Sequence, residues 1–445
     1  MNQNVKLDKR EENAPVIDVH ALSHDGRGIA AIQNKTTFIN GALPNETVTY
    51  RLTQKRSHYN EAEMLTVVKP SPDRVVPPCR HFGLCGGCSL QHMGMATQLA
   101  LKQQTLLDQL KHFGHVFPEN ILPPLQAEAV GYRRKARLGV KFVIKKNKVM
   151  VGFREKASRY LADLEQCAVL HPNVGERFVE LSQLVLSLEH YRHIPQIEIA
   201  IGDTEGALVF RHMQPLSDQD QEKLIAFGKT YNFHIYLQPN PPAPVHPIWP
   251  TNTNERLSYT LPDFQLEFLF HPLDFTQINL EINRLMVKQA IHLLDLQPEE
   301  TVLDLFCGIG NFTLPIAQRV RQVIGVEGSV DMVKRAADNA RHNRIQNADF
   351  YAANLQELPA QAAWMNLSYD KILLDPPRAG AKEVLPSLKT MRAKKIVYVS
   401  CNPATLARDA GELVHQYGYR LLQAGIMNMF PHTSHIEAMA VFEKT

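Results

Sequence analysis

The chain has 445 residues, of which 44% are hydrophobic and 21% charged, and its net charge is +3 at neutral pH. This composition is ordinary for a globular protein with two or three domains. No apolar run reaches the roughly 20 residues of a membrane helix, and the polar N-terminal segment has no signal-peptide core. Six cysteines are too few for a disulfide scaffold, which indicates a reducing compartment. We therefore expect a cytoplasmic protein.

Residues 14–69 are predicted to form a small all-β module. The stretches VIDVHAL, AIQNKTTFI, ETVTYRLTQ and EMLTVV are β-branched or alternate between apolar and polar residues. Turn-forming residues separate them at 25–28, Gly41 and Pro44-Asn45. The pattern favours a five-stranded OB-like β-barrel, a fold that often binds oligonucleotides, with a domain at 12–70. The alternative is a β appendage without a binding role.

A cysteine-rich segment follows this module. Cys79, Cys85 and Cys88 lie within ten residues of one another, and Cys167 is remote. Four thiolates can hold either structural zinc or an iron-sulfur cluster. The Cys-x5-Cys-x2-Cys spacing matches neither paired zinc knuckles nor the ferredoxin run. The spacing therefore leaves zinc and iron-sulfur about even.

A helix is predicted at 95–113, and a strongly basic stretch comes next. Between Gly131 and Arg159, eleven Lys and Arg residues stand against one acid, a net charge of +10, so the rest of the chain carries −7. Such a stretch more often marks a polyanion partner than a solvated face. Because it alternates like strands and forms no basic amphipathic helix, nucleic acid is favoured over a membrane surface. We expect a central α+β domain at 75–255 that binds RNA and ends near a proline-rich linker at 238–250.

From about residue 256 onward, apolar strands alternate with amphipathic helices, which predicts a doubly wound α/β sheet over 256–445. The expected elements are helix 278–294, strand 301–306, helix 311–320, strand 322–327, helix 330–343, strand 371–375, helix 383–390, strand 395–400, helix 403–416 and a hairpin from 419–430 and 437–444.

The strand VLDLF runs into the glycine turn CGIGNF, where the backbone can approach a ligand at the carboxyl edge of the sheet. Thr313 stands where the dinucleotide fingerprint has its third glycine. Glu327 ends the next strand, seventeen residues after Gly310, where a carboxylate can accept ribose hydroxyls. These features favour S-adenosylmethionine over NAD.

Two further strands end in unusual chemistry, at Asp375-Pro376-Pro377-Arg378 and at Cys401-Asn402-Pro403. Uracil C5 is a poor nucleophile until a thiolate adds to C6, and a base must then remove the C5 proton. Cys401 is the candidate nucleophile and Glu437, at the start of the last strand, the candidate base. The simpler alternatives are a small buried thiol and a surface carboxylate.

With these motifs the chain resembles the RNA uracil-5-methyltransferase family, in the type that methylates 23S ribosomal RNA. The segments that carry the resemblance are CRHFGLCGGCSLQH, DFTQIN, DLFCGIGNF, GVEGS, DPPRAG, VSCNP and HIEAM, and the N-terminal module resembles a TRAM domain. The resemblance implies a class I methyltransferase fold with S-adenosyl-L-methionine as methyl donor, Cys401 as nucleophile and Glu437 as base. It implies cofactor contacts from Gln277, Phe306, Asn311, Glu327, Asn354 and Asp375. It also implies a [4Fe-4S] cluster on Cys79, Cys85, Cys88 and Cys167.

Other functions remain as alternatives. RNA cytosine-5-methyltransferases usually carry a second cysteine after the Asp-x-Pro motif, where this chain has Arg378, so uracil is favoured. The substrate could instead be transfer RNA or another ribosomal site. A non-catalytic RNA-binding factor would be expected to have lost the glycine turn, the thiol or the base, and an oxidoreductase would need the third glycine. No membrane and no obligate protein partner is expected.

Overall fold

The structure, a computed structural model, describes residues 14–240, 243–251, 256–357 and 362–445. It divides into two compact units. The first contains residues up to Thr105 together with His432–Ser434, and the second contains Leu106–Pro431 together with His435–Thr445. In these described ranges, no helix is long and apolar enough to cross a membrane.

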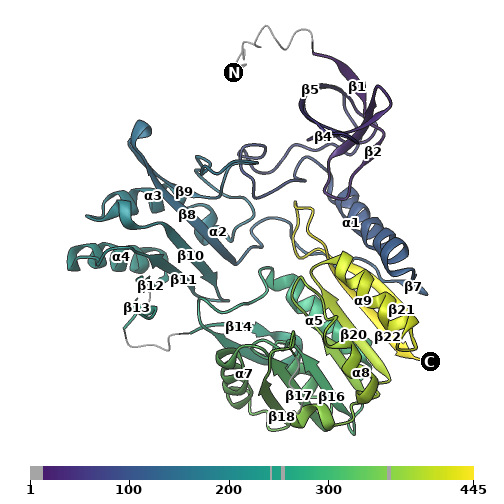
Figure 1. The fold of residues 1–445 in the computed structure, drawn as a ribbon. Helices are drawn as coiled ribbons and strands as arrows, with labels where there is room; N and C mark the ends of the chain where they lie inside the picture. Colours follow the sequence, from purple (N-terminus) through teal and green to yellow (C-terminus); the bar gives the residue numbers. More distant parts are fainter. Residues whose placement is uncertain (1–13, 241–242, 252–255, 358–361) are drawn as a thin grey trace. The chain divides into compact units, whose positions relative to one another are not determined.

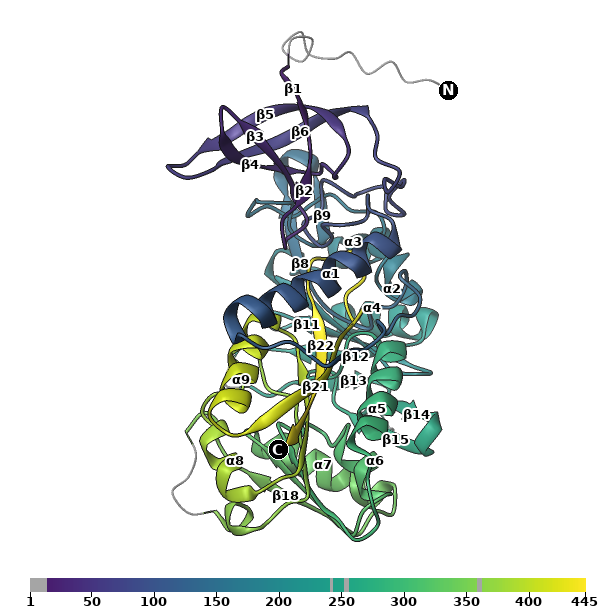
Figure 2. The same ribbon diagram turned by 90° about the vertical axis from the view of Figure 1, so that its right-hand side faces the viewer.

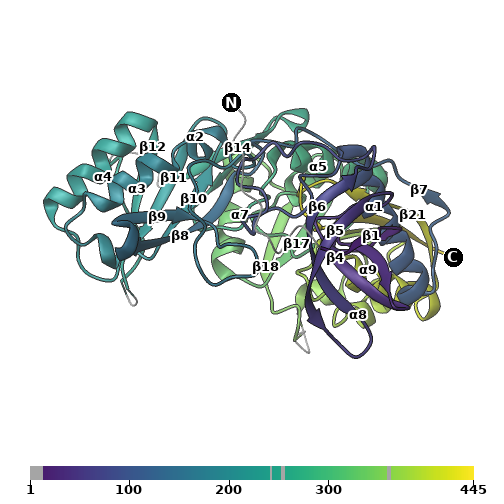
Figure 3. The same ribbon diagram turned by 90° about the horizontal axis from the view of Figure 1, so that it is seen from above.

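The first unit is built on one six-stranded sheet with the order β1-β5-β6-β4-β3-β2, whose longer strands can be followed in Figure 3. The bounds are β1 Val16–Asp18, β2 Ala21–Leu22, β3 Gly28–Ile32, β4 Lys35–Asn40, β5 Thr47–Lys55 and β6 Asn60–Lys69. Two stretches that the sequence predicts as single strands are each divided. VIDVHAL gives β1 and β2, and AIQNKTTFI is a hairpin that turns at Gln33 and Asn34, both at positive φ. Six strands therefore stand where five were expected.

Helix α1 (Met95–Gln109) continues as a π-helical turn at Leu110–Gly114, so the predicted helix 95–113 is confirmed. The chain passes from the first unit to the second within this helix, after Thr105. The π-helical turn packs closely on α9 (Pro403–His415), because a Cβ at Gly114 would lie 2.4 Å from the carbonyl oxygen of Ala407.

The second unit contains a mixed six-stranded sheet with the order β13-β12-β11-β10-β8-β9. Its strands are β8 Lys135–Val143, β9 Lys148–Gly152, β10 Gln196–Ile201, β11 Gly206–Arg211, β12 Phe233–Gln238 and β13 His246–Trp249. Helices α3 (Phe178–Leu186) and α4 (Asp218–Tyr231) cover one face, and the short α2 (Pro172–Gly175) precedes them (Figure 1). Part of the predicted linker is therefore the edge strand β13; residues 241–242 and the expected boundary at 255 lie outside the described residues.

The second unit also contains an eight-stranded sheet with the order β18-β17-β16-β19-β20-β22-β21-β7. Its strands are β7 Asn120–Ile121, β16 Thr301–Leu305, β17 Gln322–Glu327, β18 Ala348–Ala352, β19 Lys371–Leu374, β20 Lys395–Ser400, β21 Tyr419–Met427 and β22 Glu437–Lys444. Strands β16 to β20 run parallel to one another, and β22 is antiparallel to both β20 and β21. The predicted doubly wound sheet and terminal hairpin are confirmed.

Helices cover both faces of this sheet, which explains why its inner strands are continuously apolar. Figure 2 shows α5 (Leu280–Leu294) and α6 (Thr313–Ala317) on one face and α8 (Leu385–Met391) and α9 on the other. The remaining elements are α7 (Val330–His342), the hairpin of β14 (Leu257–Leu261) and β15 (Leu266–Phe270), and 3₁₀ turns at Ile144–Lys146, Tyr191–His193, Pro262–Phe264 and Ala363–Asn366. In the register of the sheet, Leu305 pairs with both Val326 and Leu374, so the strands end side by side.

Candidate active site

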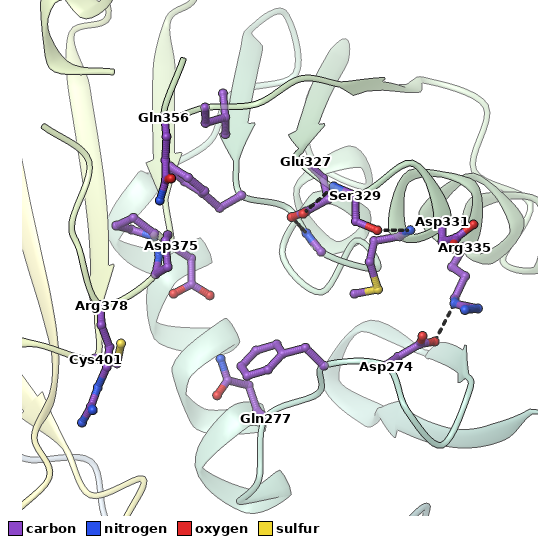
Figure 4. Close-up of a pocket in the computed structure, with 18 of the residues that line it drawn as sticks. Asp274, Gln277, Glu327, Ser329, Asp331, Arg335, Gln356, Asp375, Arg378 and Cys401 are labelled. Atoms are coloured by element: carbon purple, nitrogen blue, oxygen red, sulfur yellow. Dashed lines mark hydrogen bonds and ion pairs between the residues drawn. The ribbon is translucent and has the colours of Figure 1, made fainter. Parts of the chain in front are cut away.

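A cavity of about 740 Å³ lies at the carboxyl ends of the parallel strands in the second unit. It is where ligands bind in open α/β sheets. Seven of the eight predicted catalytic and cofactor residues line it: Gln277, Phe306, Glu327, Asn354, Asp375, Cys401 and Glu437. Figure 4 shows Glu327 and Ser329 on one side, Cys401 and Arg378 on the other, and the carboxylate of Asp375 turned into the space between.

The glycine turn after β16 and the end of β17 form the first half of the cavity. Phe306, Gly308 and Gly310 have positive φ, so the chain reverses tightly within five residues. The carboxylate of Glu327 accepts hydrogen bonds from the backbone N–H of Gly308 (3.1 Å) and of Ser329 (3.0 Å). The carboxylate is therefore fixed before any ligand arrives, with lone pairs left for hydroxyl donors. Such an acceptor fits the ribose hydroxyls of an adenosyl cofactor.

Asn311 is the predicted cofactor residue that does not line the cavity. Its side-chain oxygen accepts from the Tyr259 hydroxyl (2.9 Å) and from Asn283 (3.0 Å), and its Nδ2 donates to the Asn283 oxygen (2.8 Å). The side chain thus joins the helix α5 to the glycine turn. A cofactor contact from Asn311 stays a prediction.

Thr313, which the sequence marks only by the missing third glycine, holds a buried acid. Its hydroxyl donates to Asp304 at 2.5 Å, and burial raises the pKa of Asp304 to about 8, with Asp375 and Glu327 adding to the shift. A glycine at this position would leave that carboxyl without its hydroxyl partner.

Cys401 lies in the second half of the cavity, at the junction of β20 and α9. The strand ends at Ser400, Asn402 caps the helix by accepting from the N–H of Ala404, and Pro403 occupies the first helical turn. The turn leaves the thiol half-buried at the cavity wall. Asp375 reaches the same wall because two prolines end β19 directly after it.

Burial shifts the acids of this half toward their protonated forms at neutral pH. It raises the pKa of Glu437 to about 8, to which Asp375 adds and which Arg378 opposes. It raises the pKa of Asp375 to about 7, to which Glu327 adds. Burial, followed by Glu437 and Asp375, raises the pKa of the Cys401 thiol to about 11, while Arg378 opposes the shift. The Cys401 thiol is therefore protonated at neutral pH.

Arg378 is the functional residue that the sequence analysis missed, since there it serves only to argue against cytosine. It lines the cavity, and its guanidinium lies 2.9 Å from Nδ1 of His435. Its carbonyl oxygen accepts from Asn402 (3.0 Å) and Thr405 (3.2 Å) at the start of α9. It is a cation next to both Cys401 and Glu437, and its place in the motif DPPRAG was the available signal.

Comparison with known proteins identifies the family of the chain. The family model described as tRNA (uracil-5-)-methyltransferase matches residues 253–445, and that of the TRAM domain matches 16–65. A protein of Alcanivorax borkumensis named 23S rRNA (uracil(1939)-C(5))-methyltransferase RlmD is 52% identical over 96% of each chain. One of the same name from Francisella tularensis subsp. novicida is 51% identical over 98% of each. This chain belongs to the RNA uracil-5-methyltransferase family, as an RlmD-type member.

One solved structure bears out the fold expected of this family. The tRNA (uracil-54, C5)-methyltransferase of Pyrococcus abyssi, crystallised with S-adenosyl-L-homocysteine, superposes with a TM-score of 0.74, at 24% identity, over 96% of this chain and 99% of that one. The chain therefore has an N-terminal TRAM domain and a C-terminal class I methyltransferase fold, two of the three parts that the sequence predicts.

The predicted cluster ligands of this family member fall in both units. Cys79 is buried and Cys85 and Cys88 half-buried in the first unit, while Cys167 belongs to the second. The backbone N–H of Gly87 donates to the sulfur of Cys85 at 3.4 Å, a bond of the kind that tunes cluster thiolates. Across the described residues, no three His, Cys, Asp or Glu side chains are arranged to hold a metal. The cluster stays a prediction.

The basic stretch is partly neutralised by nearby acidic side chains. Arg137 pairs with Glu198 at 3.0 Å, and Asp163 receives Lys146 (2.8 Å) and Lys148 (2.7 Å). Burial lowers the pKa of Lys135 to about 8. Exposed cations of this stretch that face solvent instead include Lys141, Lys145, Arg154 and Arg159.

Proposed function

We propose that this chain transfers a methyl group from S-adenosylmethionine to C5 of a uracil in 23S ribosomal RNA, at position 1939 as in the names of its relatives. One observation carries the proposal: Cys401, Glu437 and Glu327 line a single cavity. The reaction requires three groups from the protein: a nucleophile, a base and a hydrogen-bond acceptor for the ribose of the cofactor. With only six cysteines in 445 residues the chain suits a reducing compartment, which fits a cytoplasmic reaction.

The cavity would hold S-adenosylmethionine through Glu327 in the cofactor half, with Gln277, Phe306 and Asn354 around it and Asp375 contacting it from the catalytic half. S-adenosylmethionine supplies an electrophilic methyl group when bound. The protein contributes a fixed acceptor, since Glu327 is held by two backbone N–H groups, and an apolar wall, since Phe306 stands at the turn.

Cys401 would add as a thiolate to C6 of the uracil, which makes C5 nucleophilic enough to take the methyl group. Glu437 would then remove the proton from C5, the C6–S bond would break, and the thiolate would leave. A base with a pKa near 8 suits proton removal at neutral pH better than an ordinary carboxylate. The nearby guanidinium of Arg378 favours both anions that the cycle needs.

Mass mapping of 5-methyluridine in ribosomal and transfer RNA from a deletion strain tests this function. We expect one site in 23S ribosomal RNA to lose its methyl group, the wild-type gene to restore it, and a Cys401→Ser gene to fail. Loss from transfer RNA instead, or no loss at all, would refute the assignment.

The proposal includes one iron-sulfur cluster, [4Fe-4S], held by Cys79, Cys85, Cys88 and Cys167. Protein purified without oxygen should be brown, with about four irons per chain, as a [4Fe-4S] cluster requires. Cys88→Ala should lose the colour, whereas Cys307→Ala, which removes a buried cysteine outside the set, should keep it. Colourless protein with one zinc would refute the cluster and leave the methylation intact.

The exposed cations of the basic stretch would bind RNA phosphates. Replacing Lys141, Lys145, Arg154 and Arg159 by Gln should flatten the dependence of RNA affinity on salt, by roughly 0.7–0.9 in log–log slope for each phosphate that is no longer neutralised. The control replaces Lys146 and Lys148, which pair with Asp163. An equal slope in both variants would show that the basic stretch is a solvated face that does not bind RNA.

A further inference from the structure

The connection between β21 and β22 leaves the second unit after Pro431 and returns to it at His435. Its three intervening residues, His432–Ser434, belong to the first unit. The backbone N–H groups of Ser89 and Leu90 both donate to the carbonyl oxygen of His432, at 2.9 Å each. The last strand thus begins directly after a segment whose main chain is bonded to the cysteine-rich region.

Gln98 of α1 secures this segment from the other side. Its side chain is fully buried, and its Oε1 accepts from the backbone N–H of His432 at 2.9 Å. Its Nε2 donates to the carbonyl oxygens of Leu90 (3.0 Å) and Met93 (2.8 Å) and lies 3.3 Å from Nδ1 of His432. A carboxylate of the same length could not donate, and an apolar side chain could do neither. Only a side chain that both donates and accepts hydrogen bonds, such as the amide of Gln98, satisfies all of these partners.

The residues on either side of this segment are held within the second unit. The hydroxyl of Tyr132 donates to the carbonyl oxygen of Pro431 at 3.1 Å, and His435 lies 2.9 Å from the guanidinium of Arg378. Glu437 is the first residue of β22, three residues after Ser434, a reach of roughly 10 Å in extended chain. Few main-chain torsions separate the anchored segment from the base.

We propose that Gln98 is a positioning residue for the methylation, acting through the main chain of His432 on the depth at which Glu437 enters the cavity. The proposal rests on the proposed function, because it assigns Glu437 as the base. Misplacement of a reacting group by about 1 Å can lower a rate by roughly a hundredfold. Removing the anchor should therefore slow the step that uses Glu437 more than the steps that use Cys401.

The test compares Gln98→Met with Gln104→Met, a substitution of the same chemistry at an exposed position of the same helix. With the full-length protein and substrate RNA, Gln98→Met should lower kcat about tenfold to a hundredfold. A methylated protein–RNA adduct should accumulate on denaturing gels, while the KM for RNA changes less than about threefold, as expected when binding is intact. Gln104→Met should match wild type.

Tyr132→Phe is the second variant, because Gln98→Met can also fail to fold. It removes only the hydroxyl that holds Pro431, so the same adduct should accumulate to a smaller extent. Adduct levels equal to wild type in both variants, or an equal loss of adduct formation and turnover, would overturn the positioning role. If wild-type protein itself forms no 5-methyluridine, the proposed function fails instead, so the two failures are distinguishable.

Discussion

The two halves of the cavity solve opposite electrostatic problems. In the cofactor half, backbone N–H groups fix the Glu327 carboxylate as an acceptor before a ligand is present. In the catalytic half, burial holds Asp375, Cys401 and Glu437 toward their protonated forms, and Arg378 opposes this shift for Cys401 and Glu437. From this difference we infer that the cofactor half is preformed for binding the cofactor. The acidic groups of the catalytic half lose their protons only as the reaction proceeds.

The substitution Cys401→Ser is expected to distinguish the two halves most clearly, because it should abolish the reaction without changing cofactor binding. A hydroxyl has a far higher pKa than a thiol, so addition to C6 should fall by about 10⁴-fold or more. Cofactor affinity measured by calorimetry should be unchanged, because Cys401 lies outside the glycine turn. A methylation rate near that of wild type would show that the nucleophile is another group.

Glu437→Gln should block the cycle later, after the methyl group has been transferred. The amide cannot take the C5 proton, so turnover should fall by about 10²- to 10⁴-fold and a methylated adduct should run as a heavier band. In wild type, breakdown of the adduct should speed up as pH rises through about 8, where Glu437 loses its proton. A variant that turns over normally would place the base elsewhere.

Glu327→Gln should act on the binding half alone. The amide keeps the size of the side chain but presents one acceptor atom to the N–H groups of Gly308 and Ser329. Cofactor affinity should fall by about 10- to 100-fold, the range of a hydrogen bond to a charged group. With saturating cofactor the rate should recover to within a few-fold of wild type. A rate that stays low would contradict the division of the cavity into a binding half and a catalytic half.

Asp375→Asn should give the smallest effect, a change in stability of the ligand-free protein. A folded-state pKa raised from 3.8 to about 7 means that Asp375 stabilises the fold fully below pH 3.8, and that this contribution is lost as pH rises through 7. The amide cannot ionise, so the variant should melt higher than wild type at pH 8 and level with it at pH 4. A lower melting temperature at pH 8 would contradict the burial argument.

The parts of the fold that the sequence predicts are those with a local signal. Strand β16 is continuously apolar because both its faces are covered, and its turn carries two glycines. The hairpin at Gln33 and Asn34 was missed because its turn has positive φ without a glycine. Strand β18 was missed because its alternation is half-exposed, with no apolar run.

The candidate site follows the same rule. Cys401 and Glu437 stand out because each interrupts an apolar strand end, so the residue type alone suggests chemistry. The direction of the Asn311 side chain is set by its hydrogen bonds with Asn283 and Tyr259. The sequence pattern around Asn311 does not reveal these partners. The partner of Gln98 lies 334 residues away, and no local spacing can indicate it.

That separation bears on how the chain folds. Bringing together two points 334 residues apart in a flexible chain is opposed by a loop entropy of about 5 kcal/mol. The contact between Gln98 and His432 therefore cannot nucleate folding and forms once shorter-range structure has closed most of the loop. The first unit has nearly all of its residues early in the chain, yet its last hydrogen bonds wait for the final hairpin. Its completion is thus a late step of folding, although most of its sheet can assemble early.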